Sequence, residues 1–442
     1  MPTRTRPGAR INTPAQKGRK STQHARLLAG MVATVNGCGY GGATVSAVIE
    51  RAGVSRPTFY DYFADRHACF QAALGDVQQQ LLERVGQRLE EEPHERALHA
   101  SVRALVELAI SEPALALFLT DAPLAGGPEA LEARDRGIAE IEQLVQRSYK
   151  SAAAEALIPD VSPGLLLGGV QRLLGARVRR GEPGLSRLLT ELLLWIERYE
   201  RPKQEHRWRT LREQPARRRC SSFEPSLQPP PQLGPGRPRI SEQDVAENHR
   251  LRILYAAASL AASKGYAATT IADITTLARI DGHVFYSLFT DKQDAFMAVH
   301  ELGMQQLQAV TASAFFAGSS WPEHILEAEL AGFQFLELNP LIAHLGYVEA
   351  YAIGPGAVQR VEDGHAAFTI FLQGGYRADS DLPRPSALAL EAIATTIFEA
   401  TYRRTRGRSK PKLSELLGPV GFLSIAPFLG VHEADVQIDR RL

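Results

Sequence analysis

The sequence predicts an all-α fold built as two tandem units, and three observations support that prediction. A pattern in residues 39–70, GYGGATVSAVIERAGVSRPTFYDYFADRHACF, returns in residues 265–296 as GYAATTIADITTLARIDGHVFYSLFTDKQDAF, without a gap. Apolar residues recur at helical spacing through most of the chain. Ala and Leu are abundant, whereas strand signals are sparse. Because the copies lie 226 positions apart, the repeat indicates duplication of a whole domain rather than a solenoid.

The length and composition of the chain bound the class of protein. A chain of 442 residues is expected to form more than one compact domain, and 44% hydrophobic content is ordinary for globular protein. A net charge of +1 gives no global sign of a nucleic-acid partner. No apolar run reaches the ~18 residues of a membrane helix, and no apolar core follows the basic start as in a signal peptide. Three scattered cysteines, Cys38, Cys69 and Cys220, fit a reducing cytoplasm better than a disulfide framework.

The first copy of the repeat predicts two short helices joined by a tight turn. Thr44 precedes an apolar stripe at helical spacing and is expected to cap the first helix. Gly53 is expected to end that helix, since only glycine enters a left-handed turn without steric cost. Ser55 then caps a second helix, in which Phe59 and Phe63 lie four residues apart and face a core. Two helices joined in this way form a helix-turn-helix, whose second helix lies in the DNA major groove.

The other face of the second helix and the start of the next helix carry polar groups. The side chains expected to face away from the core are Arg56, Thr58, Tyr60 and Tyr62. Asp65 is expected to cap the following helix, which places Arg66 at its start. The helix macrodipole disfavours a cation at that position, and a DNA phosphate would explain the placement of Arg66.

Both copies resemble the DNA-binding domain of the TetR (tetracycline-repressor) family of bacterial regulators. The Gly-Tyr, Thr-Val/Ile, Phe-Tyr-x-x-Phe and Asp-Arg/Lys pieces all keep the spacing of that family. The resemblance implies a three-helix head followed by a helical body that dimerises and often binds a small molecule. It implies a recognition helix from Ser55 to Phe63, with base-edge contacts from Arg56, Pro57 and Thr58. The expected phosphate contacts are Thr44, Tyr60, Tyr62 and Arg66, and we include Ser46 and Ser55 in the DNA-facing set.

The second copy departs from the first at the positions that would contact DNA. Its matching residues are Thr270, Gly282, His283, Val284, Tyr286, Leu288 and Lys292. Glycine replaces the arginine of the first copy, valine replaces Thr58, and leucine replaces Tyr62. Asp281 also stands where Ser55 stood. We therefore expect the second head to recognise a different half-site or to bind DNA more weakly.

The chain divides into an arm, two heads, two bodies and a linker. The expected ranges are 1–22 for a disordered basic arm, 23–70 and 71–200 for the first head and body, 201–240 for the linker, and 241–296 and 297–442 for the second head and body. Residues 1–26, which include the arm, carry seven cations and no acid, so the arm can follow the DNA backbone or remain a solvated tail. The linker is basic and then proline-rich, and it ends in Gly-Arg-Pro-Arg, whose Arg237 and Arg239 resemble an AT-hook core.

The repeat continues more faintly through the bodies, so the chain resembles two complete family subunits fused end to end. Gly127-Pro128 matches Gly354-Pro355, for example. In the family, the last two helices of each body form the dimer interface. The corresponding ranges are 163–180 with 184–200, and 386–404 with 412–430. Pro419 and Pro427 are expected to interrupt the last of these helices and make the bundle asymmetric.

The second body is rich in aromatic residues, which leaves two interpretations open. They are Phe315, Phe316, Trp321, Phe333, Phe335, Tyr347, Tyr351, Phe368, Phe371, Tyr376 and Phe398. They can line a pocket for a small apolar or aromatic effector, or they can be ordinary helical core, which is the commoner role for any single residue. His324, His344 and His365 lack metal-ligand spacing, and we expect no metal or cofactor.

The sequence therefore favours a sequence-specific transcription regulator that binds operator DNA at the nucleoid in the cytoplasm. We expect a repressor released by a small molecule, acting as a covalent pseudo-dimer of its two halves, as a homodimer, or in a larger assembly. A second interpretation keeps the fold but makes the second half a ligand-sensing or pairing module whose head no longer contacts DNA. An enzyme is disfavoured, because the chain has no Gly-x-Ser-x-Gly elbow, phosphate loop, dinucleotide fingerprint or Cys-x-x-Cys pair.

Overall fold

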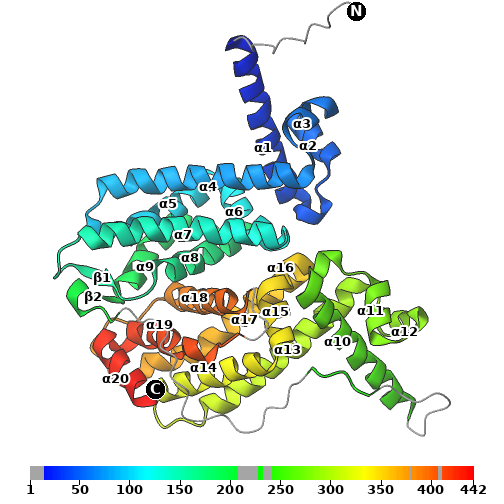
Figure 1. The fold of residues 1–442 in the computed structure, drawn as a ribbon. Helices are drawn as coiled ribbons and strands as arrows, with labels where there is room; N and C mark the ends of the chain where they lie inside the picture. Colours follow the sequence, from blue (N-terminus) through cyan, green and yellow to red (C-terminus); the bar gives the residue numbers. More distant parts are fainter. Residues whose placement is uncertain (1–13, 208–226, 232–240, 379, 407–410) are drawn as a thin grey trace, which may run out of the picture.

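A computed structural model describes residues 14–207, 227–231, 241–378, 380–406 and 411–442. Within these residues the chain is almost entirely helical and forms two units, drawn one above the other in Figure 1. Each unit has a small three-helix head at one end of a larger helical body. Residues 1–13 of the predicted arm, together with Cys220, Arg237 and Arg239, lie outside the described residues.

The first head consists of α1 (Pro14–Gly42), α2 (Val45–Ala52) and α3 (Arg56–Tyr62). The predicted boundary of the disordered arm at residue 22 is wrong, because α1 already begins at Pro14. The helix bends at Gly39, whose φ of 70° lies in the left-handed region that glycine enters without strain. Leu27 and Met31 are fully buried and attach α1 to the other two helices of the head.

The first body follows the apolar stripes of the sequence. Its elements are α4 (Arg66–Glu91), η1 (His94–Arg96), α5 (Ala97–Ser111), α6 (Pro113–Ala125), α7 (Pro128–Ser151), β1 (Leu157–Pro159), α8 (Pro163–Arg179), α9 (Leu185–Glu197), β2 (Glu200–Pro202) and η2 (Lys203–Glu205). The helix α4 joins the head to the body, because it begins inside the repeated pattern and continues into the first body. Prolines begin α6, α7 and α8, where their missing N–H groups have no intrahelical partner.

A short two-stranded sheet closes the first body, and the sequence did not predict it. Strand β1 pairs antiparallel with β2, and Ile158 lies opposite Arg201. The predicted start of the linker at residue 201 is therefore wrong. Arg201 is 7% exposed and its Nη1 lies 2.9 Å from Asp435 of the second unit, so this segment is part of the folded core.

The second unit repeats the same order of elements with several changes. Its head consists of α10 (Glu242–Ala268), α11 (Ile271–Ala278) and α12 (Gly282–Leu288). Its body consists of α13 (Lys292–Phe315), α14 (Trp321–Leu338), α15 (Pro340–His344), the π-helical turn η3 (Leu345–Glu349), α16 (Ala350–Ile353), α17 (Pro355–Gln373), η4 (Gly374–Arg377), α18 (Ala387–Thr405), η5 (Ser414–Leu416), α19 (Leu417–Leu429) and α20 (Val431–Arg441). The helix α10 bends at Gly265, which matches the bend of α1 at Gly39.

The two bodies pack through their last long helices, and α8 lies against α18. One hydrophobic core contains residues of both units, and the hydroxyl of Tyr199 donates a hydrogen bond to the carbonyl of Leu423 over 2.9 Å. The prediction that prolines interrupt α19 is wrong. Pro419 lies in the first turn, where no N–H is needed, and Pro427 lies close enough to the end that the helix continues to Leu429.

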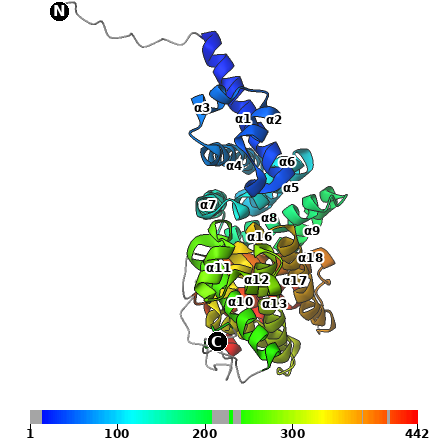
Figure 2. The ribbon, with the colours of Figure 1, turned by 90° about the vertical axis from the view of Figure 1, so that its right-hand side faces the viewer.

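The packing of the bodies places both heads toward one side of the molecule. In Figure 1 each head lies at the right-hand end of its own unit, and Figure 2 shows the same side turned toward the viewer. No helix among the described residues is long and apolar enough to cross a membrane.

Candidate nucleic-acid interface

Local interactions define the ends of the helices in the first head. The Thr44 hydroxyl accepts a hydrogen bond from the backbone N–H of Ala47 over 3.2 Å and caps α2. Gly53 ends α2 in the left-handed conformation, with φ of 60°. The Ser55 hydroxyl accepts from the N–H of Thr58 over 3.3 Å and caps α3. Phe59 is fully buried, and so the opposite side of α3 faces solvent.

The solvent-facing side of α3 carries most of the predicted DNA contacts of the first head. Arg56 is exposed, and its Nη2 donates to the hydroxyl of Ser46 on α2 over 2.7 Å. Pro57 is exposed beside it, and Tyr60 is 51% exposed although its ring is large and apolar. This contact brings Arg56 and Ser46 together from two helices. The surface thus offers one flexible guanidinium, hydroxyl groups and an aromatic edge on a rigid helix.

Two further predicted contacts, Thr58 and Tyr62, are half-buried. The Thr58 hydroxyl is 2.8 Å from that of Ser55, so both belong to the capping arrangement of α3. Tyr62 is half-buried, and its ring lies 5.6 Å from the ring of His24 on α1. These residues border the exposed surface, and part of each side chain also stabilises the head.

The placement of Arg66 has an internal explanation, which corrects the expectation that a phosphate accounts for it. Its Nη1 donates to the carbonyl of Ala43 over 2.7 Å and to that of Tyr40 over 3.1 Å. Its guanidinium also lies over the Tyr40 ring, 4.6 Å from the ring centre. Arg66 therefore satisfies backbone carbonyls at the end of α1 and fastens α1 to α4.

The second head shares several scaffold contacts with the first. Lys292 replaces Arg66, and its Nζ donates to the carbonyls of Thr269 and Tyr266 over 2.9 and 3.0 Å. The internal explanation given for Arg66 applies to Lys292 too. Phe285 is fully buried in place of Phe59. The sequence analysis missed one further pair, in which Arg26 and Arg252 each donate to the carbonyl that ends the first helix of the motif. Their common offset of 226 was the available signal.

The exposed surface of the second head differs from that of the first. Gly282 and His283 are exposed, but glycine offers no side chain where the first head has arginine. Asp281 makes no side-chain cap to α12, although Ser55 caps the equivalent helix. Tyr286 is 61% exposed, whereas Val284 and Leu288 are half-buried. Among the described residues of α12, the face that would meet DNA has no fixed cation.

An acidic side chain engages Thr270, the residue of the second head that corresponds to Thr44. The carboxylate of Asp273 accepts hydrogen bonds from the N–H and hydroxyl of Thr270, over 2.8 and 2.6 Å, and from Lys264 over 2.6 Å. The bond from Lys264 and those from Thr270 hold the pKa of Asp273 below its usual range. The first head has Ala47 at this position, so its Thr44 is not engaged by a carboxylate.

The turn after α11 in the second head carries more backbone strain than the equivalent turn after α2 in the first head. Arg279 occupies the position of Gly53 and adopts φ of 52° and ψ of 53°. It is the one non-glycine residue with positive φ in the described part of the chain. A side chain in this conformation carries a steric cost that glycine does not.

The second body contains a cavity of about 110 Å³. Four of the predicted aromatic residues line it, namely Tyr347, Phe368, Phe371 and Phe398. His300 and His365 also line it, and both are largely buried. Burial, followed by the charge of Arg360, lowers the pKa of His300 to about 4. Burial, followed by the charge of Arg172, lowers the pKa of His365 to about 3. Both imidazoles are therefore neutral at pH 7.

A larger hollow of about 860 Å³ lies where the two units meet beside the second head. It is lined by the end of α10, the start of α7, the residues around Glu349 and the basic end of α18. Glu349 accepts a hydrogen bond from the N–H of Tyr266 over 2.8 Å, so the second head is tied to its own body at this point. Among the described residues, no group of three or more His, Cys, Asp or Glu side chains is placed to hold a metal ion.

Two helix-turn-helix heads, each with an exposed second helix on a three-helix scaffold, define a DNA-binding protein. Residues 36–73 and 253–299 each match the sequence profile described as "Bacterial regulatory proteins, tetR family". The chain is a TetR-family DNA-binding transcription regulator with two tandem TetR-like units. No curated protein matches the sequence.

Two solved structures are similar to part of the chain. A TetR family transcription regulator from Marinobacter aquaeolei VT8 is 18% identical, with a TM-score of 0.35, and the match covers 42% of this chain and 99% of that one. A regulatory protein of the tetR family from Rhodococcus RHA1 is 20% identical, also with a TM-score of 0.35, over 41% of this chain and 97% of that one.

Proposed function

We propose that this regulator is a repressor that binds operator DNA as a covalent pseudo-dimer. One observation carries the proposal: a single chain holds two heads, and the packing of α8 on α18 directs both heads toward one side of the molecule. A helix-turn-helix dimer contacts two successive major grooves, ~34 Å apart, so two heads are the number that one operator needs. The chain thus acts on DNA in the cytoplasm as a regulator rather than as an enzyme.

In the first head, we assign base-edge contacts to Arg56, Pro57 and Thr58. Tyr60, Tyr62, Thr44 and Ser46 contact the phosphates on either side. The exposure of Arg56 and its position beside Ser46 support this assignment, because the guanidinium can leave the hydroxyl and bond a guanine edge in two places. Arg66 acts on DNA only indirectly, by holding α1 in place.

In the second head, we assign weaker and different contacts to His283 and Tyr286. Gly282 removes the arginine, and the Asp273 carboxylate competes with a phosphate for the N–H and hydroxyl of Thr270. The operator is therefore an imperfect palindrome, with one half-site recognised more strongly than the other.

We further propose that the cavity of the second body binds the effector. Its aromatic lining suits a small apolar or aromatic molecule, and the neutral imidazoles of His300 and His365 can each bond one polar atom of it. Binding releases DNA only if the effector has a higher affinity for a conformation in which the spacing of the heads does not match the operator. A panel of small aromatic compounds, none of which changes operator affinity, would count against this part of the proposal.

A second candidate function is supported by Asp273. If its carboxylate excludes phosphate, the second head contributes no DNA contact and the second half only pairs and senses. Tyr60→Ala and Tyr286→Ala test this as a matched pair, since both residues are exposed and neither supports the core. Equal losses of operator affinity support two working heads. A loss from Tyr60→Ala alone supports the second candidate, and Asp273→Ala should then raise DNA affinity.

The decisive experiment selects random duplex DNA with the intact protein at a stated salt concentration, because phosphate contacts make affinity depend on salt. Two different half-sites about one helical turn apart support the covalent pseudo-dimer. A perfect palindrome means that two chains each present a first head, which contradicts it. No enrichment, with and without the compounds of the effector panel, contradicts the regulator mechanism itself.

A further inference from the structure

The helices that join the two units are equivalent elements of the repeat. Residues 166–170 on α8 read LLGGV, and residues 393–397 on α18 read IATTI, at an offset of 227. In a symmetric dimer, the residues closest to the twofold axis contact their own copies. The same holds here with the two copies in one chain: Gly169 lies against Thr396, and Arg172 bonds Glu399, both 227 positions apart. Each contact therefore marks a place where a like pair of units would bring two identical residues together.

The first of these contacts, Gly169 against Thr396, leaves no room for a side chain at position 169. A Cβ atom added at Gly169 would lie 2.9 Å from the Cα of Thr396, which is closer than real side chains approach a backbone. A Cβ atom added at Gly168 would lie 2.6 Å from the Cγ of Glu399. The side chains of α18 thus occupy space that α8 leaves empty. Two copies of α18 at this separation would place threonine against threonine.

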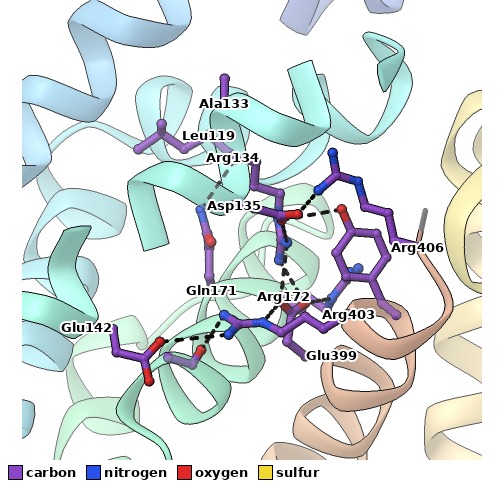
Figure 3. A network of polar contacts seen from close by, with 12 residues as sticks. Leu119, Ala133, Arg134, Asp135, Glu142, Gln171, Arg172, Glu399, Arg403 and Arg406 are labelled. Atoms are coloured by element: carbon purple, nitrogen blue, oxygen red, sulfur yellow. Dashed lines mark hydrogen bonds and ion pairs between the residues drawn. The ribbon is translucent and has the colours of Figure 1, made fainter. Parts of the chain in front are cut away.

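The second contact, between Arg172 and Glu399, is a buried ion pair, and Figure 3 shows it from close by. Glu399 is fully buried, and its carboxylate accepts hydrogen bonds from Arg134 over 2.8 Å and from Arg172 over 2.7 Å. Arg403, on the same helix as Glu399, donates to it over 2.9 Å. Burial alone would raise the pKa of Glu399, but the three guanidinium groups outweigh burial and hold the pKa well below its usual range. The carboxylate is therefore ionised and compensated.

The deeply buried ion pairs between the units, among the described residues, all have the same polarity. Arg134 and Arg172 are 2% and 6% exposed, and Arg201, 7% exposed, bonds Asp435 of the second unit over 2.9 Å. In every described ion pair between units with both side chains at most 10% exposed, the first unit supplies the cation and the second the anion. The reverse pairs, Arg406 with Asp135 and Arg403 with Glu142, are partly exposed.

Like pairs of units would lose this compensation. Two first units would bury Arg134 and Arg172 from both sides without Glu399, and Arg134 would keep only the partly exposed Asp135 of its own unit. Two second units would place Glu399 beside Glu399, with only the Arg403 side chains nearby. An unpaired buried charge is strongly unfavourable because it loses its hydration without gaining a partner. Like-charge contacts of this kind are a known way in which proteins reject a wrong partner.

We propose that α8 and α18 form a one-way recognition surface, through which a first unit pairs only with a second unit. The surface keeps one head of each kind in every assembly, whatever the concentration of protein. This inference deepens the proposed pseudo-dimer, but it rests on the contacts between the bodies and not on DNA binding. Its test is therefore independent of whether an operator is found.

The test begins with the intact chain. A protease site is inserted between residues 208 and 226, the purified protein is cleaved, and the masses of the native assemblies are measured over a range of concentrations. We expect assemblies with equal numbers of first and second fragments, either one of each or two of each. Dimers of like fragments would overturn the proposal. Fragments that part into monomers at micromolar concentration would also overturn it.

Two variants of the cleavable chain locate the recognition in the buried pair. Glu399→Gln keeps the size of the side chain and removes its charge, so the affinity between fragments should fall about 30-fold or more. Glu391→Gln is the matched control, because Glu391 also lies on α18 and bonds Arg177 of the first unit, but its side chain is 38% exposed. The control should change the affinity less than about threefold, as exposed pairs contribute little. Equal effects of the two variants would contradict a role for buried charge.

Discussion

The two heads share nearly every contact that builds the fold and differ at nearly every position that faces solvent on the recognition helix. Phe59 and Phe285 are both fully buried, and Arg66 and Lys292 both hold two carbonyls at the end of the preceding helix. By contrast, Arg56 has become Gly282. The residues that define the head are shared by the two copies, whereas the solvent-facing surface of the second helix differs. The two heads therefore present one fold with two different surfaces.

The two heads differ on their surface, whereas the two bodies differ in their interior. Leu74 and Ile138 fill the first body and are buried, and the equivalent positions of the second body hold His300 and His365 beside a cavity. Heads that differ on the outside and bodies that differ on the inside suggest a division of labour. We propose that the first half supplies the larger share of DNA affinity and that the second half binds the effector.

The largest expected effect tests whether the two heads really share one scaffold. Phe59→Ala and Phe285→Ala should each destabilise their own head by about 3–5 kcal/mol, since both delete a fully buried ring. Hydrogen exchange of the amides in α2 and α3, and in α11 and α12, reports each head separately. Tyr60→Ala is the control and should cost less than about 0.5 kcal/mol, because that ring is exposed. A much smaller loss for Phe285→Ala would break the equivalence of the heads.

The next effect concerns the bodies and depends on pH. The folded pKa values of His300 and His365, about 4 and about 3, lie below the ordinary value of 6.5. Below pH 6.5 the unfolded chain therefore takes up protons that the folded chain does not, and stability falls as the pH falls toward 4. The loss is about 1.4 kcal/mol per pH unit for each residue. The double variant His300→Leu/His365→Ile copies the first body and should remove most of this slope.

Denaturant unfolding of the second body between pH 7 and pH 4.5 measures the slope. His99 of the first body also has a pKa lowered to about 4, by burial and then by Arg96, and it remains in the variant as a constant background. An unchanged slope in the double variant would mean that other groups control the acid response. The pair His300 and His365 would then not cause a difference in acid stability between the two bodies.

Local features of the sequence were sufficient to predict the scaffold of the heads. Thr44, Ser55 and Asp65 cap helices within three residues, and the spacing of Phe59 and Phe63 shows the buried side. The fold class follows from such short-range patterns repeated along the chain. Arg56, Pro57 and Tyr60 on α3 are exposed, because the face opposite a buried stripe is exposed in a short helix, whereas Thr58 and Tyr62 are half-buried.

Interactions between distant residues were not predictable. The backbone carbonyls that accept from Arg66 lie within its reach because α1 bends at Gly39 and ends close to the start of α4. The sequence does not show this bend, and so it suggested a phosphate as the partner of Arg66. Strand β2 forms only because β1, more than 40 residues earlier, lies beside it. Two of the three partners of Glu399 lie 227 and 265 positions away, and the third, Arg403, forms an ordinary i,i+4 pair that any solvated acid on a helix can make.

A smaller effect sharpens the comparison of the DNA-contacting surfaces. Arg56→Ala should weaken binding to the selected operator by about 1–3 kcal/mol, as expected for loss of a bidentate contact to a base. His283→Ala in the second head should cost less, because an imidazole makes at most one bond there. Binding to unrelated duplex at the same salt is the control and should change little. A larger loss from His283→Ala would reverse the assignment of the stronger head.

The smallest effect lies in the turn, where the second head departs from the first in its backbone. Arg279 carries a side chain at φ of 52°, where the first head has Gly53 at φ of 60°. Arg279→Gly removes the steric cost of that conformation, although glycine also makes the unfolded chain more flexible. The second head should therefore gain about 0.5–1 kcal/mol. The backbone carbonyl that accepts from Arg252 is kept in the variant, so that contact does not confound the result.

The reciprocal change, Gly53→Arg, transfers the arginine to the first head and should destabilise it by about 1 kcal/mol or more. A Cβ atom there would also press on Nη2 of Arg26, a flexible group that can move aside. Hydrogen exchange within each head measures both variants. Opposite signs would mean that the second head tolerates a strained turn that the first avoids. If Arg279→Gly instead lowers stability, the arginine side chain itself supports the second head, and the two turns have diverged in function as well as in sequence.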